Sequence, residues 1–122
     1  NPERVRSIAR SYLESIKPAG VKMELHFDHG AAAVAVDRKH PAMRAGLEAL
    51  SEAFDSKAVL SGIGASIPVV KLFTDLYHVP VVLMGVGNVD SAIHSPNENL
   101  KLDHYYRGIE ASVLFLQKYS AL

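Results

Sequence analysis

The feature that most constrains the fold of this chain is an apolar run that leads into a loop and then into a long amphipathic segment. Residues 79–84 read Val-Pro-Val-Val-Leu-Met, a β-branched run without alternation that is typical of a strand covered on both faces. The loop over 84–98 contains His94 directly before a Ser-Pro-Asn turn, and from Leu102 apolar residues recur at helical spacing. In open α/β sheets ligands bind at the carboxyl ends of strands, so we expect the chemistry of this chain in the loop.

The second half of the chain alternates between predicted helices and strands. In chain order these are a helix over 41–54, a strand over 57–60, a helix that begins at Pro68, the strand over 79–84 and a closing helix over 102–119. This order is typical of a βαβ unit with flanking helices. In a parallel pair of strands, the loops over 62–66 and 85–98 open on the same edge of the sheet and form one site. The first loop offers backbone N–H groups and a hydroxyl that suit a carboxylate or an oxyanion, and the second offers His94.

The first half begins with a helix and continues with strand-like segments. Asn1-Pro2-Glu3 is a strong helix start, and apolar residues at helical spacing up to Ile16 predict one buried face. Residues 21–27 alternate between apolar and polar side chains, as in an antiparallel strand with one face in water, while 31–36 are either a second strand or an extended connector. Residues 37–41 are charged and end in proline, which favours a domain boundary. Because the chain begins directly on a helix start, we expect it to have been cut from a longer protein.

The predicted fold class is therefore α/β, in two parts. Residues 1–37 form a helix plus an antiparallel strand or strands, and residues 38–122 form a β-α-β-α segment. At 122 residues the chain has the length of one ordinary domain or of pieces of two.

Composition excludes several classes of partner. The chain has 13 basic and 13 acidic residues, so no excess of positive charge indicates nucleic acid. No apolar run approaches the roughly 20 residues of a membrane span, and the N-terminus lacks the layout of a signal peptide, so we expect no membrane partner and a cytoplasmic location. The absence of cysteine excludes disulfides and thiol chemistry.

Three segments, in order, carry a family resemblance. They are Gly-Ala-Ser-Ile-Pro-Val over 64–69, Val-Val-Leu-Met-Gly-Val-Gly over 81–87 and His-Ser-Pro-Asn-Glu over 94–98. Together they resemble the C-terminal part of the dinuclear-zinc peptidase superfamily, which includes carnosinases and related dipeptidases, carboxypeptidase G, aminoacylase and succinyl-diaminopimelate desuccinylase. The resemblance covers nearly the whole chain and is nearest to the dipeptidase branch. It implies that residues 1–37 are the second half of the family's lid or dimerisation domain, and that 38–122 are the C-terminal segment of its catalytic α/β domain.

The resemblance also implies an activity and a set of site residues. The implied activity is hydrolysis of amide bonds in dipeptides or N-acylated amino acids by a metal-activated water, with two zinc ions per complete site, or manganese or cobalt in some relatives. His94 aligns with the family's last metal-ligand histidine, and Gly64, Ala65 and Ser66 fall in its substrate-binding Gly-Gly-Ser-Ile-Pro loop. Ala65 replaces the second glycine of that loop, and Gly62 stands where dipeptidases often have arginine, which bears on the substrate class.

The family's other metal ligands, its general-base glutamate and a lid arginine match no residue of this chain. We therefore expect the chain to hold no catalytic residue, to need the upstream part of the same enzyme and to be inactive alone, because a catalytic zinc site needs about three protein ligands. Closure of the lid about residues 37–41 would complete the site. Because relatives often pair through their lids, a homodimer is a further expectation.

Each signal also has a structural interpretation. A histidine before a turn is often a cap or a surface residue, and Ser66 without a matched base is more typical of a helix cap than of a nucleophile. Gly85-x-Gly87 resembles a dinucleotide loop, but no third glycine follows. The five histidines other than the one in the loop form no i, i+4 pair and are expected at the surface, with His29 nearest to the hinge. The alternative function is a non-catalytic α/β binding or interaction module that uses the loop over 62–66 to hold an anion.

Overall fold

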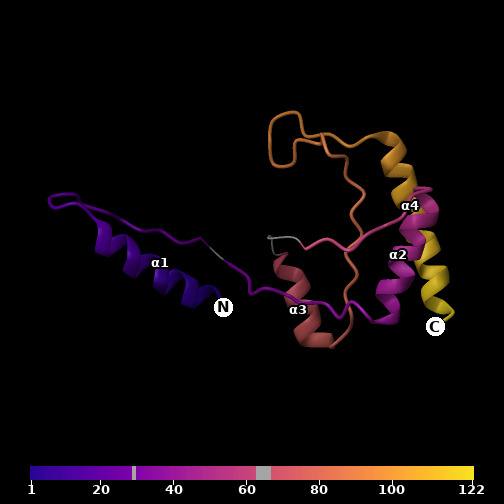
Figure 1. Cartoon of the computed structure of the whole chain (residues 1–122), viewed down its shortest axis with the longest axis horizontal. Helices are drawn as coiled ribbons and strands as arrows, with labels where there is room; N and C mark the ends of the chain where they lie inside the picture. Colours follow the sequence, from indigo (N-terminus) through magenta and orange to yellow (C-terminus); the bar gives the residue numbers. More distant parts are fainter. Residues whose placement is uncertain (29, 63–66) are drawn as a thin grey trace. The chain divides into compact units, whose positions relative to one another are not determined.

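A computed structural model of the chain describes residues 1–28, 30–62 and 67–122, and over these residues it contains four α-helices (Figure 1). In chain order they are α1 (Pro2–Ile16), α2 (Pro41–Ala53), α3 (Pro68–Tyr77) and α4 (Leu102–Ser120). Each coincides, within a residue or two, with a helix predicted from the sequence. None of the described helices is both long enough and apolar enough to cross a membrane.

The contacts between residues divide the chain into two compact units. One unit contains α1 and α3, and the other, formed by residues 36–62 and 80–122, contains α2 and α4. The predicted division into a lid half (1–37) and a catalytic segment (38–122) refers to a complete enzyme and stays a prediction.

The predicted α/β fold class is wrong for this structure, because the described residues form no β-strand and therefore no sheet. The predicted strands over 21–27, 57–60 and 79–84 run as non-helical segments, and 31–36 is a connector. A strand exists only where its backbone N–H and C=O groups pair with a neighbouring segment. A β-branched composition favours an extended backbone but does not supply the neighbour. Neither the antiparallel strand of the half lid nor the β-α-β-α segment is therefore formed by the described residues.

In the first unit, the residues that follow α1 return along the helix. Asn1 caps α1, and its Oδ1 accepts a backbone N–H of the first turn at 3.1 Å, as the sequence predicts. Arg6 donates to the carbonyl of Asp28, and the guanidinium of Arg10 lies 5.3 Å from the centre of the Phe27 ring. Two arginines on one face of α1 thus hold the end of the following segment.

The apolar faces of α1 and α3 are largely exposed, although apolar residues at helical spacing on α1 predict one buried face. On α1, Val5 is 64% exposed and Tyr12 is 62% exposed. On α3 only Val70 is buried, while Phe73 and Leu76 lie at the surface. Apolar residues at helical spacing favour each helix, but their burial requires a second apolar surface. No described element covers these faces.

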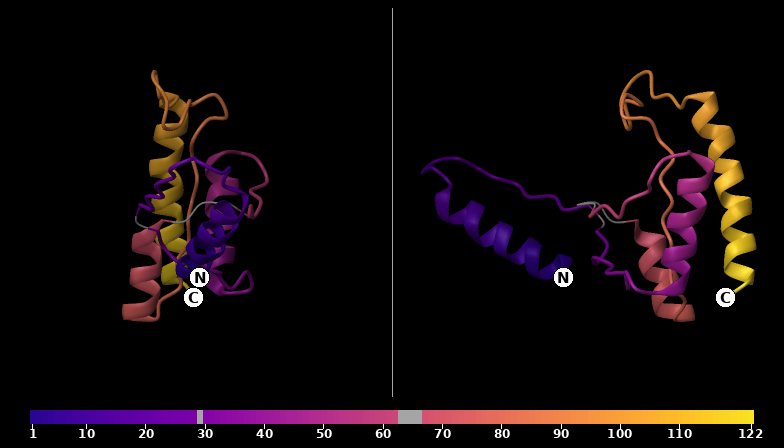
Figure 2. Two further views of the ribbon diagram at one scale, coloured as in Figure 1. Left: turned by 90° about the vertical axis from the view of Figure 1, so that its left-hand side faces the viewer. Right: turned by 45° about the vertical axis from the view of Figure 1, so that its right-hand side comes forward.

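In the second unit, α2 and α4 pack side by side (Figures 1 and 2). The buried face of α2 consists mainly of small residues at helical spacing, namely Ala42, Ala45, Gly46, Ala49 and Ala53. Ala111 of α4 is also fully buried. Small side chains let the two backbones come close together. Of the larger apolar residues, Met43 is buried, whereas Leu47, Leu50 and Phe54 are only half-buried.

Within the second unit, the segment over 82–86 lies against this helix pair with every second residue. A Cβ atom added to Gly46 of α2 would lie 2.7 Å from Cγ1 of Val82, and one added to Gly108 of α4 would lie 3.1 Å from Val86. Leu83, between them, is 57% exposed. The segment therefore keeps the period-two alternation of a strand, with one face on the helices. The predicted burial on both faces is wrong here, because no described element covers the second face.

Candidate functional site

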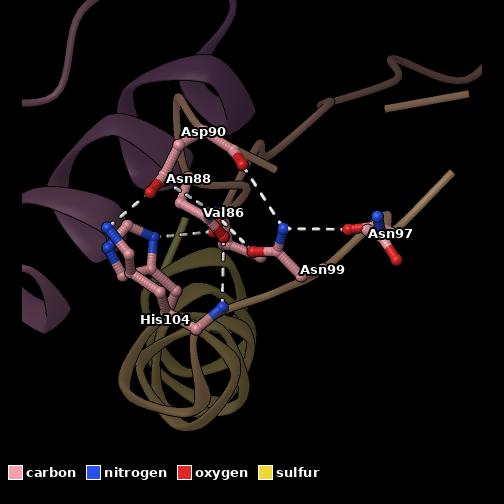
Figure 3. A network of polar contacts seen from close by, with 7 residues as sticks. Val86, Asn88, Asp90, Asn97, Asn99 and His104 are labelled. Carbon is pink, nitrogen blue, oxygen red and sulfur yellow. Dashed lines mark hydrogen bonds and ion pairs between the residues drawn. The ribbon is translucent and has the colours of Figure 1, made fainter. Parts of the chain in front are cut away.

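The loop that contains His94 is closed by the side chain of Asn88, which is only 5% exposed (Figure 3). Its Oδ1 accepts a hydrogen bond from the backbone N–H of Lys101 at 3.1 Å, thirteen residues further along the chain. Its Nδ2 donates to the carboxylate of Asp90 at 2.8 Å and to Oδ1 of Asn99 at 3.2 Å. The amide thus uses its acceptor and both donors, and one buried group joins the beginning of the loop to its end.

Backbone groups complete the closure. The N–H of Ser91 donates to the carbonyl of Asn88 at 3.1 Å, and the N–H of Asn99 donates to the carbonyl of Ser91 at 2.9 Å. The side chain of Asn99 also donates to the carbonyls of Asp90 and Asn97, at 3.3 and 3.1 Å (Figure 3). Short amide side chains that bond to nearby backbone groups stabilise turns in this way.

His94 lies in the first of two successive turns. The N–H of Ser95 donates to the carbonyl of Ala92 at 2.9 Å, and the second turn closes on the carbonyl of Ser95 at 3.2 Å. In the second turn, Pro96 and Asn97 (φ 66°) occupy the positions that a type II turn assigns to proline and to a residue with positive φ. His94, with φ 61°, occupies the corresponding position of the first turn. The predicted Ser-Pro-Asn turn after His94 is confirmed.

The conformation of His94 is unusual for a residue with a side chain. Its φ lies in the left-handed region, which costs about 1–3 kcal/mol and persists only where the surroundings hold it. Its side chain is exposed. Neutral imidazole is the commonest metal ligand in proteins, and strained backbone of this kind clusters at functional sites.

The described residues do not form a metal centre by themselves. Across residues 1–28, 30–62 and 67–122, no group of three or more His, Cys, Asp or Glu side chains could hold a metal ion. A catalytic zinc site needs about three protein ligands. This part of the chain therefore lacks a complete ligand set.

The predicted substrate-binding residues Gly64, Ala65 and Ser66 lie outside the described residues, so their roles stay predictions. The prediction that they lie close to His94 depends on a parallel pair of strands, whose carboxyl ends share one edge of a sheet. Because the described residues form no sheet, that basis is wrong for this structure.

The network around Asn88 also changes the acidity of Asp90. The hydrogen bond from Asn88 is the largest cause that holds the pKa of the Asp90 carboxyl below its ordinary value. The backbone N–H of Asp90 and the ammonium of Lys101, 3.3 Å from the carboxylate, lower the pKa further. Asp90 therefore carries a negative charge at neutral pH.

The base of the loop is fixed to α4. Nδ1 of His104 lies 3.0 Å from the carbonyl oxygen of Val86, and the imidazole packs edge-on against the ring of Phe54 with centroids 5.5 Å apart. One turn further along α4, Arg107 donates to the carbonyl of Ala53 at 2.8 Å. The bond to Val86 fixes the entry of the loop to α4, and the contacts with Phe54 and Ala53 join α4 to the end of α2.

The prediction that the other histidines are surface groups is wrong for two of them. His104 is half-buried at the base of the loop, and His40 is half-buried at the start of α2. Nδ1 of His40 accepts the N–H of Ala42 at 3.1 Å and caps the helix. His29 lies outside the described residues.

Sequence reasoning also missed the residues that close the loop. The available signal was a pair of Asn or Asp residues at each end of it, Asn88 with Asp90 and Asn97 with Asn99. Such residues are typical of turns because their short side chains reach backbone groups. Their reciprocal bonding across the loop, however, depends on tertiary closure.

Part of the chain is similar in sequence to known proteins. No protein-family model matches the chain. The chain is 35% identical over 57 residues to the Cys-Gly metallodipeptidase DUG1 of Saccharomyces cerevisiae, a match that covers 47% of this chain and 12% of that protein. It is 34% identical over 59 residues to the Beta-Ala-His dipeptidase of Homo sapiens, with 48% and 12% covered. About half of the chain is therefore similar to dipeptidase-type metallopeptidases, which are hydrolases, and the match spans about an eighth of the length of each relative.

Proposed function

We propose that this chain is the C-terminal portion of a metal-dependent hydrolase that cleaves amide bonds of dipeptides or N-acylated amino acids. The observation that carries the proposal is the similarity of about half of the chain to two dipeptidases. The match spans 12% of each relative, and the described residues lack a complete ligand set. The proposal therefore includes an upstream part of the same enzyme, which supplies the remaining ligands and the general base.

His94 is proposed as one metal ligand. When bound, two zinc ions, or manganese or cobalt in their place, would supply an activated water. Three features of His94 support this role, namely its exposed imidazole, its positive φ and its place in a loop that the buried Asn88 closes. A ligand that is held in one direction before the metal arrives loses less conformational freedom on binding.

The proposed substrate is a small peptide or an N-acyl amino acid. Backbone N–H groups of Gly64, Ala65 and Ser66 are proposed to hold its carboxylate or the oxyanion that develops during hydrolysis. Residues 1–37 are proposed as half of a lid, through which two copies pair. The exposed apolar face of α1 supports such a contact, because a face of this kind gains free energy from a partner. A cytoplasmic location stays a prediction.

The test uses the complete protein that contains this chain. His94→Ala is expected to lose about one metal equivalent per subunit and to reduce turnover by several orders of magnitude, because one of about three ligands of one metal is removed. The melting temperature of the metal-free protein should change little, and the comparison is made without metal because bound metal itself stabilises the fold. His26→Ala, which removes an exposed histidine outside the loop, is the control. If His94→Ala keeps full metal content and near-normal turnover, His94 is a turn residue and the ligand assignment fails.

The same proposal predicts that the 122-residue chain alone hydrolyses no dipeptide when zinc, manganese or cobalt is added. Turnover that survives repurification and disappears in His94→Ala would contradict this. The alternative of a non-catalytic anion-binding module depends on the loop over 62–66, of which 63–66 lie outside the described residues. No observation on the described residues favours it.

A further inference from the structure

One buried polar side chain of the loop, Asn88, is not itself a ligand in the proposed metal chemistry. At 5% exposure it has lost nearly all contact with water. A buried amide costs free energy unless its hydrogen bonds are made, and Asn88 makes them with Asp90, Asn99 and Lys101. The hydrogen bonds of Asn88 therefore restrict the backbone conformation of the residues that lie between its partners in the chain.

Asn88 stands at the junction between the loop and a rigid frame. Two residues before it, Val86 lies against Gly108 of α4. Its partner Lys101 is the N-cap residue of α4, and the side chain of Lys101 makes no capping hydrogen bond. The oxygen of Asn88 thus joins the entry of the loop to its exit at one end of α4.

Between these two fixed points, the backbone adopts a conformation that would not persist by itself. Ala92, His94 and Asn97 have φ of 52°, 61° and 66°. Pro96 and Asn97 specify their own turn, but Ala92 and His94 each cost about 1–3 kcal/mol in this region, so these two residues would relax toward negative φ if the ends of the loop were free. A change of φ at His94 turns the Cα–Cβ bond and with it the direction of the imidazole.

We infer that Asn88 is the positioning residue for His94: by joining both ends of the loop at α4, it holds His94 at positive φ and sets the direction in which the imidazole leaves the loop. The inference rests on the proposed function, because the direction of the imidazole matters for activity only where it is a ligand. The hold on the loop itself is a property of the metal-free chain.

The test compares three variants of the metal-free, full 122-residue chain. Asn88→Ala removes all three side-chain bonds, whereas Asn88→Asp keeps an acceptor for the N–H of Lys101 and loses the two donors. Asn97→Gly is the matched control, since it removes another amide of the loop, tolerates the positive φ and keeps the carbonyl that Asn99 uses. The readouts are hydrogen exchange at the N–H groups of Asn99 and Lys101 and the NMR signals of the His94 ring.

In Asn88→Ala, exchange at both N–H groups is expected to rise at least about tenfold, and the ring signals of His94 to move to those of a histidine in an unstructured peptide. Amides of α2 and α4 should keep their protection. Asn88→Asp should restore protection at Lys101 and return the His94 signals part of the way, and the control should match the parent chain. Unchanged exchange and unchanged His94 signals in Asn88→Ala overturn the inference. If Asn88→Ala unfolds the helices, Asn88→Asp decides, and failure to restore protection at Lys101 counts against the inference.

A second arm in the complete protein separates this inference from the proposed function. Asn88→Ala is expected to weaken zinc binding about 10–100-fold, as loss of an outer partner of a ligand does. The same change in a His94→Ala background should have no further effect on zinc. If His94→Ala retains full zinc while Asn88→Ala still loosens the loop in the metal-free chain, the ligand role fails and the hold of Asn88 on the loop stands. If Asn88→Ala weakens zinc binding equally in both backgrounds, Asn88 does not act through His94 and the inference fails.

Discussion

Gly46 of α2 and Val82 approach so closely that a Cβ atom on the glycine would lie 2.7 Å from Cγ1 of the valine. In the interior of a helix, glycine is less favourable than alanine by about 1 kcal/mol. Its presence at this buried position is explained by the contact, since any larger residue would push the segment of Val82 away from the helix. The position of the segment that enters the His94 loop thus depends on the absence of one methyl group.

Gly46→Ala is therefore expected to destabilise the chain despite its higher helix propensity. Overpacking costs about 1–3 kcal/mol and the gain in propensity is about 1 kcal/mol, so we expect the free energy of unfolding to fall by up to about 2 kcal/mol. Urea denaturation followed by circular dichroism measures the change. In Gly46→Ala/Val82→Ala the clash is gone, so the double variant should be more stable than the sum of the single effects predicts. An increase in stability for Gly46→Ala alone would show that the contact is loose.

Two substitutions at His94 separate the role of the imidazole from the role of the turn. Both His94→Ala and His94→Gly remove the ring, and both should lose the same metal equivalent in the complete protein. Glycine adopts a positive φ without strain, so His94→Gly should be more stable than His94→Ala by about 1 kcal/mol in the metal-free chain. Thermal denaturation of the two variants side by side measures this difference. Equal stabilities would indicate that φ at this position is not held positive in solution.

Asp90 predicts an acid-dependent loosening of the loop. Because the pKa of its carboxyl is lowered in the folded chain, ionised Asp90 contributes stability above the ordinary aspartate pKa, and this contribution is lost as the pH falls below about 4. NMR titration of the carboxyl carbon should give a pKa below that of an aspartate in an unstructured peptide. Since the bond from Asn88 is the largest cause, Asn88→Ala should raise the pKa of Asp90, whereas Asn97→Gly should leave it in place. A normal pKa for Asp90 in the parent chain would mean that the bond is not formed.

The ion pair between α2 and α4 predicts a loss of stability at high pH. Nζ of Lys118 lies 2.8 Å from the carboxylate of Glu52, and the hydrogen bond between them raises the pKa of the lysine above its ordinary value. The contribution of the pair is therefore present in full below the ordinary lysine pKa and is lost as the pH rises above it. NMR titration of the Lys118 ammonium measures the pKa, and Glu52→Gln should lower it. Glu14→Gln, which removes a carboxylate from α1, is the control and should leave the pKa of Lys118 unchanged.

Local signals in the sequence were sufficient to predict the helices. Asn1 before a proline, Pro68 after an isoleucine and the apolar spacing from Leu102 onward each correspond to a helix boundary in the structure. The turn after His94 was predicted for the same reason, because proline and asparagine specify a turn within four residues. Features of this kind depend on contacts between residues that are close in the chain.

The sheet and the core could not be predicted in the same way. The run over 79–84 favours an extended backbone, but whether it becomes a strand depends on a neighbouring segment. Leu47 and Phe54 are apolar residues at helical spacing, yet the buried surface of α2 is formed mainly by Gly46 and its neighbouring alanines. Hydrophobicity alone does not reveal where two backbones come close enough to exclude a side chain.

The sequence by itself determined the four helices, the Ser-Pro-Asn turn and the presence of a histidine immediately before it, because each is specified by residues a few positions apart. Only the tertiary structure decided that Asn88 reaches Lys101 across thirteen residues, that Gly46 and Gly108 admit the segment beside the helices, and that no described segment pairs to form a sheet. These outcomes depend on contacts between distant parts of the chain. The entropic cost of closing a loop is offset only when buried groups such as the Asn88 amide make all of their hydrogen bonds.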